Sequence, residues 1–219
     1  PGMITALRKG EILFNSANVS YQKQLSCSTC HPENHLDGLT YDIGLDGLGR
    51  NLVDNRTMRG IAGTAPFKWN GKNASLYMQC GIRFARFLTR GQPFSFEDLN
   101  ALVAYYSSLR PPPNRWRLPD GKLTPAQARG KEIFERTVTR TGAPIPAINR
   151  CVTCHPEPDG TNLRTFDVGT TSPFDKSPWE SSEGFDTPQL NAIVMSAVSS
   201  VRTPSAMSLR RKTEMYIPG

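Results

Sequence analysis

One five-residue pattern, Cys-x-x-Cys-His, occurs twice in this sequence of 219 residues. The copies consist of Cys27, Cys30 and His31, and of Cys151, Cys154 and His155. Two thiols three positions apart can form thioethers with the two vinyl groups of one haem, and the adjacent histidine then lies under the iron as its proximal ligand. Two of the three histidines in the chain stand in this position. The pattern therefore predicts two covalently bound haem c groups.

Other uses of paired cysteines fit this spacing poorly. A zinc site built from two Cys-x-x-Cys pairs needs the pairs about 15–20 residues apart, whereas Cys30 and Cys151 lie in different halves of the chain. A thioredoxin-like dithiol needs a strand–helix–strand setting, and no strand pattern lies near either motif. The fifth cysteine, Cys80, is expected to be a small buried residue. The alternative for Cys80 is an intermolecular disulfide or a reactive thiol.

The charge pattern limits the kinds of partner, and the haem chemistry limits the cellular compartment. The net charge is +7, from 26 Lys+Arg against 19 Asp+Glu, but the basic residues are scattered. This favours a solvated surface over a nucleic-acid partner. No run reaches the roughly 18 consecutive apolar residues of a membrane-spanning helix. Because haem is joined to apocytochromes after export, we expect a periplasmic or extracellular protein. Its expected partners are small cytochromes, cupredoxins or a larger redox complex. A homo-oligomer is the candidate for self-association.

The two halves of the sequence match each other. Residues 8–14 (Arg-Lys-Gly-Glu-Ile-Leu-Phe) precede the first haem motif, and residues 128–134 (Ala-Arg-Gly-Lys-Glu-Ile-Phe) precede the second. Gly10 thus corresponds to Gly130. Further on, the Ser-Leu pair at 75–76 falls in step with the pair at 208–209. We interpret the chain as a duplication, in which each half has an opening helix, a haem loop, a long excursion and closing helices.

Capping signals place two of the helices. Thr124 is followed by Pro125 and Gln127, which is a capping box with proline at the first helical position, and predicts a helix to about Arg136. Ser95 opens a second predicted helix that ends before the prolines at 111–113. Its apolar face consists of Leu99, Leu102, Val103 and Tyr106.

No convincing strand alternation is present. We therefore predict a mainly α fold with long ordered loops. Its parts are a first domain at 1–110, a Pro-rich linker at 111–123 and a second domain at 124–219, each domain packed around one haem.

Short motifs in a common order identify a family resemblance. They are Leu-Ser-Cys at 25–27, Asp-Gly-Leu at 37–39, Asn-Arg-Thr-Met-Arg-Gly-Ile at 55–61, Thr-Ala-Pro-Phe at 64–67, Trp-Asn-Gly-Lys at 69–72 and Phe-Asp-Thr-Pro-Gln-Leu at 185–190. Through these motifs the chain resembles the dihaem cytochrome c peroxidase and MauG-like superfamily of bacterial c-type cytochromes. The resemblance implies two cytochrome-c-like helical domains that face each other.

The same resemblance assigns roles to three further residues. Trp69 lies in the slot where the family places a tryptophan between the haems, so it would couple the haems electronically; the alternative is a packing residue. Gln79 matches a glutamine beside the peroxide-binding haem of the peroxidases. Asn55 matches an asparagine that helps to bind calcium between the domains, which makes calcium a candidate additional cofactor.

The proton-transfer groups of the peroxidases are missing from the sequence. The family's distal histidine would fall near Leu45 or Asp46, and no histidine stands there. Residues 80–86, where the peroxidases carry an acid, contain no carboxylate. Cleavage of peroxide needs a group that moves a proton between its two oxygens. We therefore expect low peroxidase activity, with Gln79 and Asp46 as the remaining candidate catalytic residues.

Several side chains are candidates for the second axial position on each iron. His35 is the one histidine outside the two motifs. It is either a free surface histidine or a ligand of another haem, because its loop is too short to reach the first iron readily. Met58 and Met78 are candidates for the first haem, whereas Met215 and Tyr216 are candidates for the second. Packing is the alternative role of each methionine. An axial methionine would raise the haem potential relative to two histidines.

These features favour an electron carrier. The leading hypothesis is a dihaem c-type cytochrome that relays electrons between redox partners in the periplasm or outside the cell. The first alternative is a cytochrome c peroxidase-like enzyme that reduces hydrogen peroxide. The weaker alternative is a haem-carrying subunit of a larger electron-transfer assembly.

Overall fold

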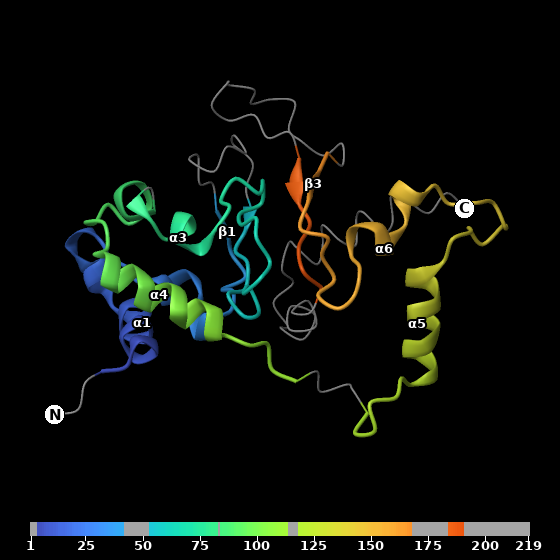
Figure 1. Ribbon diagram of the computed structural model, residues 1–219, viewed down its shortest axis with the longest axis horizontal. Coiled ribbons are helices and arrows are strands. Elements are labelled where there is room, and N and C mark those ends of the chain that lie inside the picture. Colours follow the sequence, from blue (N-terminus) through green and yellow to red (C-terminus); the bar gives the residue numbers. More distant parts are fainter. Residues whose placement is uncertain (1–3, 42–52, 83, 114–117, 168–183, 191–219) are drawn as a thin grey trace.

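The structure is a computed structural model that describes residues 4–41, 53–82, 84–113, 118–167 and 184–190. It is mainly α, with little strand. Figure 1 shows two lobes side by side: one carries α1, α3 and α4, and the other carries α5 and α6. The chain passes from α4 to α5 along one edge, and the turns around β1 face β3 at the centre.

The first lobe is built on two long helices. They are α1 (Ala6–Asn15) and α4 (Phe96–Ser108), and the four-residue helices α2 (Cys27–Cys30) and α3 (Leu76–Gln79) lie between them in sequence. Single helical turns occur at Ala17–Val19, Tyr21–Lys23, Pro32–Asn34 and Phe84–Leu88. Strands β1 (Thr40–Tyr41) and β2 (Val53–Asp54) form an antiparallel ribbon in which Thr40 pairs with Asp54.

The core of this lobe lies where α1 crosses α4. A Cβ atom on Gly10 would lie 2.1 Å from the Ala101 carbonyl oxygen, so the backbones of the two helices approach too closely for a side chain at this position. Phe14 is 1% exposed and packs against two tyrosines of α4, with ring centroids 5.5 Å from Tyr105 and 5.7 Å from Tyr106. These contacts bury the apolar face of α4 in the same cluster as Cys27 of the first motif.

The second lobe repeats the opening of the first. Helix α5 (Pro125–Glu135) precedes a single turn at Ala147–Asn149 and the short helix α6 (Cys151–Cys154). Strands β3 (Thr165–Phe166) and β4 (Phe185–Asp186) form a second antiparallel ribbon, in which Thr165 pairs with Asp186. No residue of α5 is buried, in contrast to Gly10 and Phe14 of α1.

The predicted helix boundaries are confirmed where the structure describes them. The Thr124 hydroxyl accepts a hydrogen bond from the Gln127 N–H, and the Gln127 side chain accepts one from the Thr124 N–H. The Ser95 hydroxyl likewise caps α4, whose residues Leu102, Val103 and Tyr106 are buried. The two short ribbons were not predicted. The closing helices expected around 208–209 lie outside the described residues. None of the helices described is long and apolar enough to cross a membrane.

Candidate haem-attachment sites

The two Cys-x-x-Cys-His motifs have the same backbone. Each pair of cysteines lies in a four-residue helix, α2 or α6, which the histidine ends. His31 has φ −120° and ψ 61°, and His155 has φ −123° and ψ 60°. The N–H of His31 donates to the Cys27 carbonyl at 3.0 Å, and that of His155 donates to the Cys151 carbonyl at 2.9 Å. The two cysteines of each motif are therefore held one helical turn apart in the same geometry.

The histidine of each motif is oriented by a backbone carbonyl. His31 Nδ1 lies 3.1 Å from the carbonyl oxygen of His35, and His155 Nδ1 lies 2.7 Å from that of Gly160. A carbonyl only accepts hydrogen bonds, so Nδ1 carries the proton and Nε2 keeps its lone pair. Burial lowers the pKa of His31, which favours the same neutral form. Histidine ligands of metals are oriented in this way, so both residues fit the role of an axial ligand to haem iron.

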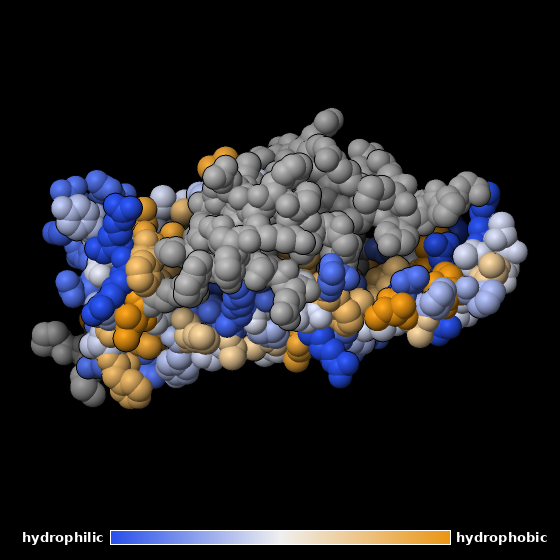
Figure 2. Space-filling view, turned by 90° about the horizontal axis from the view of Figure 1, so that it is seen from above, coloured by the Kyte–Doolittle hydropathy of each residue, from blue (hydrophilic) through white to orange (hydrophobic). Residues whose placement is uncertain are grey.

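The surroundings of the cysteines also fit a covalently attached haem. All five cysteines are free of disulfides. Near the second motif, Ile148 is 61% exposed and Leu163 is 45% exposed, although both are large apolar residues. Asn162 holds this segment against α6, since its N–H donates to the Cys154 carbonyl at 3.0 Å. Figure 2 shows apolar side chains on the surface at the end of the molecule that carries α5 and α6. A flat apolar macrocycle attached at Cys151 and Cys154 would cover such a surface.

Cys80 is buried, as predicted, in the core of the first lobe. It packs in one cluster with Cys27, Phe14 and Tyr106. Burial is the main reason why the pKa of the Cys80 thiol is raised well above its ordinary value. A thiol in these surroundings is protonated and weakly nucleophilic at neutral pH. In the structure Cys80 therefore has a packing role.

The candidate distal ligands have different settings. His35 Nδ1 lies 2.8 Å from the Thr57 hydroxyl, and its buried Nε2 has no hydrogen-bond partner among the described residues. Met58 is partly buried against the core, and its N–H donates to the Asn34 carbonyl just after the first motif. Met78 is 55% exposed. Met215 and Tyr216 lie outside the described residues. The ligand role of each of these residues stays a prediction.

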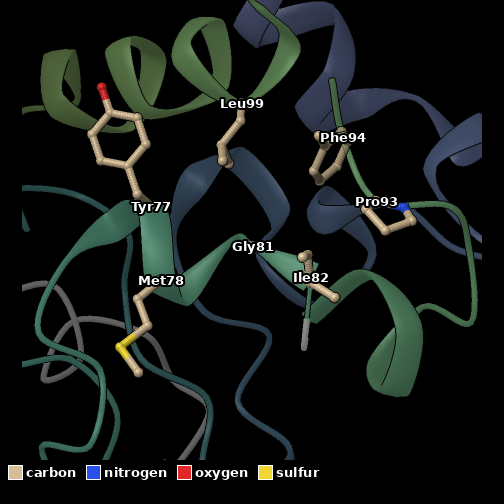
Figure 3. Close-up of a pocket in the computed structure, with 7 residues that line it drawn as sticks. All are labelled: Tyr77, Met78, Gly81, Ile82, Pro93, Phe94 and Leu99. Atoms are coloured by element: carbon tan, nitrogen blue, oxygen red, sulfur yellow. The ribbon is translucent and has the colours of Figure 1, made fainter. Parts of the chain in front are cut away.

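An apolar cavity of about 360 Å³ lies beside Met78. Its walls come from α3, the residues that follow it and α4: Tyr77, Met78, Gly81, Ile82, Pro93, Phe94 and Leu99. In Figure 3 the Met78 side chain extends away from Leu99 and Phe94. None of the residues that line this cavity belongs to the first motif.

Trp69 lies where the two lobes touch. The Arg56 guanidinium stacks over its ring, 4.4 Å from the centroid. The Trp69 carbonyl accepts a hydrogen bond of 2.7 Å from the N–H of Asp186, which belongs to β4 of the second lobe. Arg56 also forms an ion pair with Asp186 at 2.9 Å. The sequence did not assign a role to Arg56 or Asp186, although they belong to the motifs at 55–61 and 185–190 that carry the family resemblance.

The residues proposed for catalysis and calcium binding are engaged by neighbouring groups. The Asn73 amide donates to the Gln79 side-chain oxygen. The Asn55 amide donates to the Cys30 carbonyl and lies 3.4 Å from Asp37 Oδ1. In the described part of the chain, no three His, Cys, Asp or Glu side chains gather as a metal site. Asp46 lies outside that part. Calcium binding and the catalytic role of Gln79 stay predictions.

Comparison with known proteins identifies the fold class of the chain. No family model matches the chain. It matches the crystal structure of a MauG-like protein associated with microbial copper homeostasis with a TM-score of 0.53 and 19% identity, over 88% of this chain and 68% of that one. The fold is therefore, at a coarse level, that of the cytochrome c peroxidase and MauG-like proteins.

The chain is homologous to the hydrazine synthase subunit gamma of Kuenenia stuttgartiensis. The two are 33% identical in an alignment of 181 positions, and the alignment covers 75% of this chain and 48% of that protein. In a xenon-pressurised structure of Kuenenia stuttgartiensis hydrazine synthase, one chain matches with a TM-score of 0.70 and 29% identity, over 90% of this chain and 74% of that one. The chain spans about half the length of the curated relative it matches.

Proposed function

We propose that this chain is a dihaem c-type cytochrome that relays electrons as a subunit of a hydrazine synthase-like complex outside the cytoplasm. The observation that carries this proposal is the repeated attachment geometry: two Cys-x-x-Cys-His motifs with the same backbone and the same orientation of the imidazole. The motifs lie in two lobes that touch at Trp69. We assign the lobes to domains at 1–110 and 124–219, with the Pro-rich linker at 111–123.

The residues present support one-electron chemistry at two centres. When bound, haem c supplies a reversible one-electron carrier. Cys27 and Cys30 would attach the first haem, and Cys151 and Cys154 would attach the second. His31 and His155 each direct one lone pair, because a backbone carbonyl fixes the proton on the other ring nitrogen. Trp69 would lie on the path between the centres, since its backbone carbonyl accepts a hydrogen bond from the second lobe.

The peroxidase alternative has less support. A peroxidatic centre needs a proton carrier beside the iron. In the structure the oxygen of the Gln79 side chain accepts a hydrogen bond from the buried Asn73 amide. Residues 79–88 offer no carboxylate. Electron relay requires neither group, so it is the function that these residues favour.

Assembly into a larger complex follows from homology. The relative is a subunit by name, and a homologue of a subunit is expected to have the same kind of neighbours. Because haem c is attached after export, we expect the proposed complex in the periplasm or outside the cell. Small cytochromes and cupredoxins remain the proposed electron donors or acceptors.

Stopped-flow reduction of the mature holoprotein tests the relay. We expect two electrons to be taken up per chain from a reduced small cytochrome, and no sustained turnover when hydrogen peroxide is added. Native mass spectrometry of the complex purified from the source cells should show this chain in stoichiometric association with other subunits. Peroxide turnover of tens per second or more, in the ordinary enzymatic range, would contradict the relay and favour the peroxidase.

A further inference from the structure

We propose that Arg56 and Asp186 form a positioning pair that ties the two histidine loops together across the contact between the lobes. This inference rests on the proposed dihaem function, and it names the residues that fix the two centres relative to each other. The Arg56 backbone hydrogen-bonds with the His31 ring, whereas Asp186 is linked to His155 through the residues beside it.

The pair joins a partly exposed arginine, whose side chain is 29% exposed, to a buried aspartate through two hydrogen bonds. Arg56 Nη1 donates to Asp186 Oδ2 at 2.9 Å, and Nη2 donates to the Asp186 carbonyl at 3.4 Å. The Asp186 side chain is 5% exposed. Among the ion pairs between described residues, this is the one that joins the two lobes. The same guanidinium stacks on Trp69, so one side chain contacts both the second lobe and the predicted bridging residue.

On the first lobe, a short chain of bonds leads from this pair to His31. Thr57 follows Arg56 in sequence, and its hydroxyl lies 2.8 Å from His35 Nδ1. The His35 carbonyl in turn lies 3.1 Å from His31 Nδ1. The orientation of the His31 ring therefore depends on a loop that is anchored one residue away from Arg56.

On the second lobe, an equivalent chain leads to His155. Thr187 follows Asp186, and its carbonyl accepts a hydrogen bond of 2.7 Å from the Thr161 hydroxyl. Thr161 follows Gly160, whose carbonyl lies 2.7 Å from His155 Nδ1. The two proximal histidines are thus connected through one ion pair, with a threonine beside each member of the pair.

Loss of either charge should loosen both ends of this connection. Asp186 Oδ1 is buried and has no hydrogen-bond partner among the described residues, so Arg56 is the group that compensates its charge. A buried charge left without its partner is costly. Opening of the contact between the lobes exposes the remaining charge to water and so lowers that cost. The loops at 31–35 and 155–161 are then no longer held by the Arg56–Asp186 pair. Coupling of this kind is reciprocal: a change at Arg56 is felt at His155, and a change at Asp186 is felt at His31.

Hydrogen exchange of the holoprotein tests the pair. In Arg56→Gln and in Asp186→Asn we expect amide exchange to become faster by about 5- to 150-fold, in both 31–35 and 155–161. Arg56→Lys keeps the charge but loses the two-pronged geometry, so it should show a smaller change in both loops. It also carries the test if Arg56→Gln does not fold. Lys9→Gln is the matched control, because Lys9 pairs with Asp98 within the first lobe; it should leave 155–161 unchanged.

A second readout follows electron exchange between the two centres. After fast one-electron reduction, the electron that leaves one centre reaches the other, and this equilibration should slow in Arg56→Gln and recover partly in Arg56→Lys. Faster exchange confined to the lobe that carries the substitution, or unchanged equilibration, would overturn the positioning role. The hydrogen-exchange result tests the role of the Arg56–Asp186 pair independently of the number of bound haems. A wild-type chain with fewer than two haems would instead contradict the proposed function.

Discussion

At the residue scale, equivalent glycines of the two halves have different surroundings. A Cβ on Gly10 would meet the Ala101 carbonyl oxygen at 2.1 Å and the Tyr105 Cβ at 2.6 Å. A Cβ on Gly130 would have no neighbour within 4 Å. The sequence aligned the two glycines but could not distinguish them, because the difference comes from α4, which crosses α1 from the far end of the first half.

These glycines give a matched pair of substitutions. Gly10→Ala should destabilise the protein by about 1–3 kcal/mol, because the added methyl group overlaps the backbone of α4. Gly130→Ala should stabilise it by about 0.5–1 kcal/mol, since alanine is the better helix former at an open position. Urea unfolding of the two holoprotein variants measures both effects. Equal effects of the two substitutions would contradict the packing of α1 on α4.

At the scale of elements, the sequence predicted the helix boundaries, which depend on local interactions. Thr124 and Ser95 cap their helices as expected, because a cap depends on residues within one turn. The two ribbons could not be predicted in this way. Thr40 pairs with Asp54, and Thr165 with Asp186, in strands of only two residues each. Such strands carry no alternation of apolar and polar residues, and tertiary contacts determine where they form.

The docking of α1 on α4 should depend on pH. Lys9 bonds to Asp98 at 2.8 Å and to Glu97 at 2.7 Å. The hydrogen bond from Lys9 is the main cause that lowers the pKa of Asp98. A carboxyl whose pKa is lower in the folded state stabilises the fold above its unfolded value of about 3.9, and this stability is lost as the pH falls through the lower folded value.

Urea unfolding as a function of pH measures this contribution. In the wild-type chain the free energy of unfolding should fall as the pH decreases below about 3.9, and part of that fall should be absent in Asp98→Asn. The control is Glu135→Gln, because Glu135 pairs with Lys131 within α5 of the second lobe and takes no part in the packing of α1 on α4. An identical pH profile for the wild type and Asp98→Asn would show that the pair contributes nothing to docking.

At the scale of the whole molecule, the sequence predicted the duplication and both attachment motifs, but not how the halves meet. Local spacing is sufficient for the motifs, since Cys27, Cys30 and His31 belong to one turn. The contact between Arg56 and Asp186 joins residues 130 positions apart, and no periodicity encodes such a pair. The family resemblance predicted Trp69 between the two haems, and the structure adds that its carbonyl accepts the N–H of Asp186 in the second lobe.

Trp69→Phe tests the predicted role of this tryptophan in the whole molecule. Both haems should stay bound, because Trp69 belongs to neither attachment motif. Electron equilibration between the centres should slow, and reduction of the holoprotein should become biphasic. The matched control is Trp116→Phe, a substitution of the same type in the linker. Unchanged kinetics in Trp69→Phe would leave the tryptophan with a packing role alone.

The most direct test of the account is the mass of the mature polypeptide after expression with a c-type haem maturation system. We predict the polypeptide mass increased by two haem groups, together with haem staining of the band after denaturing electrophoresis. The double variant Cys27→Ser and Cys30→Ser should lose one increment, and Cys151→Ser with Cys154→Ser should lose the other. Cys80→Ser should keep both. A wild-type mass without two haem increments would contradict the assignment of the two motifs as the attachment sites. Loss of haem in the single variant Cys80→Ser would contradict it as well.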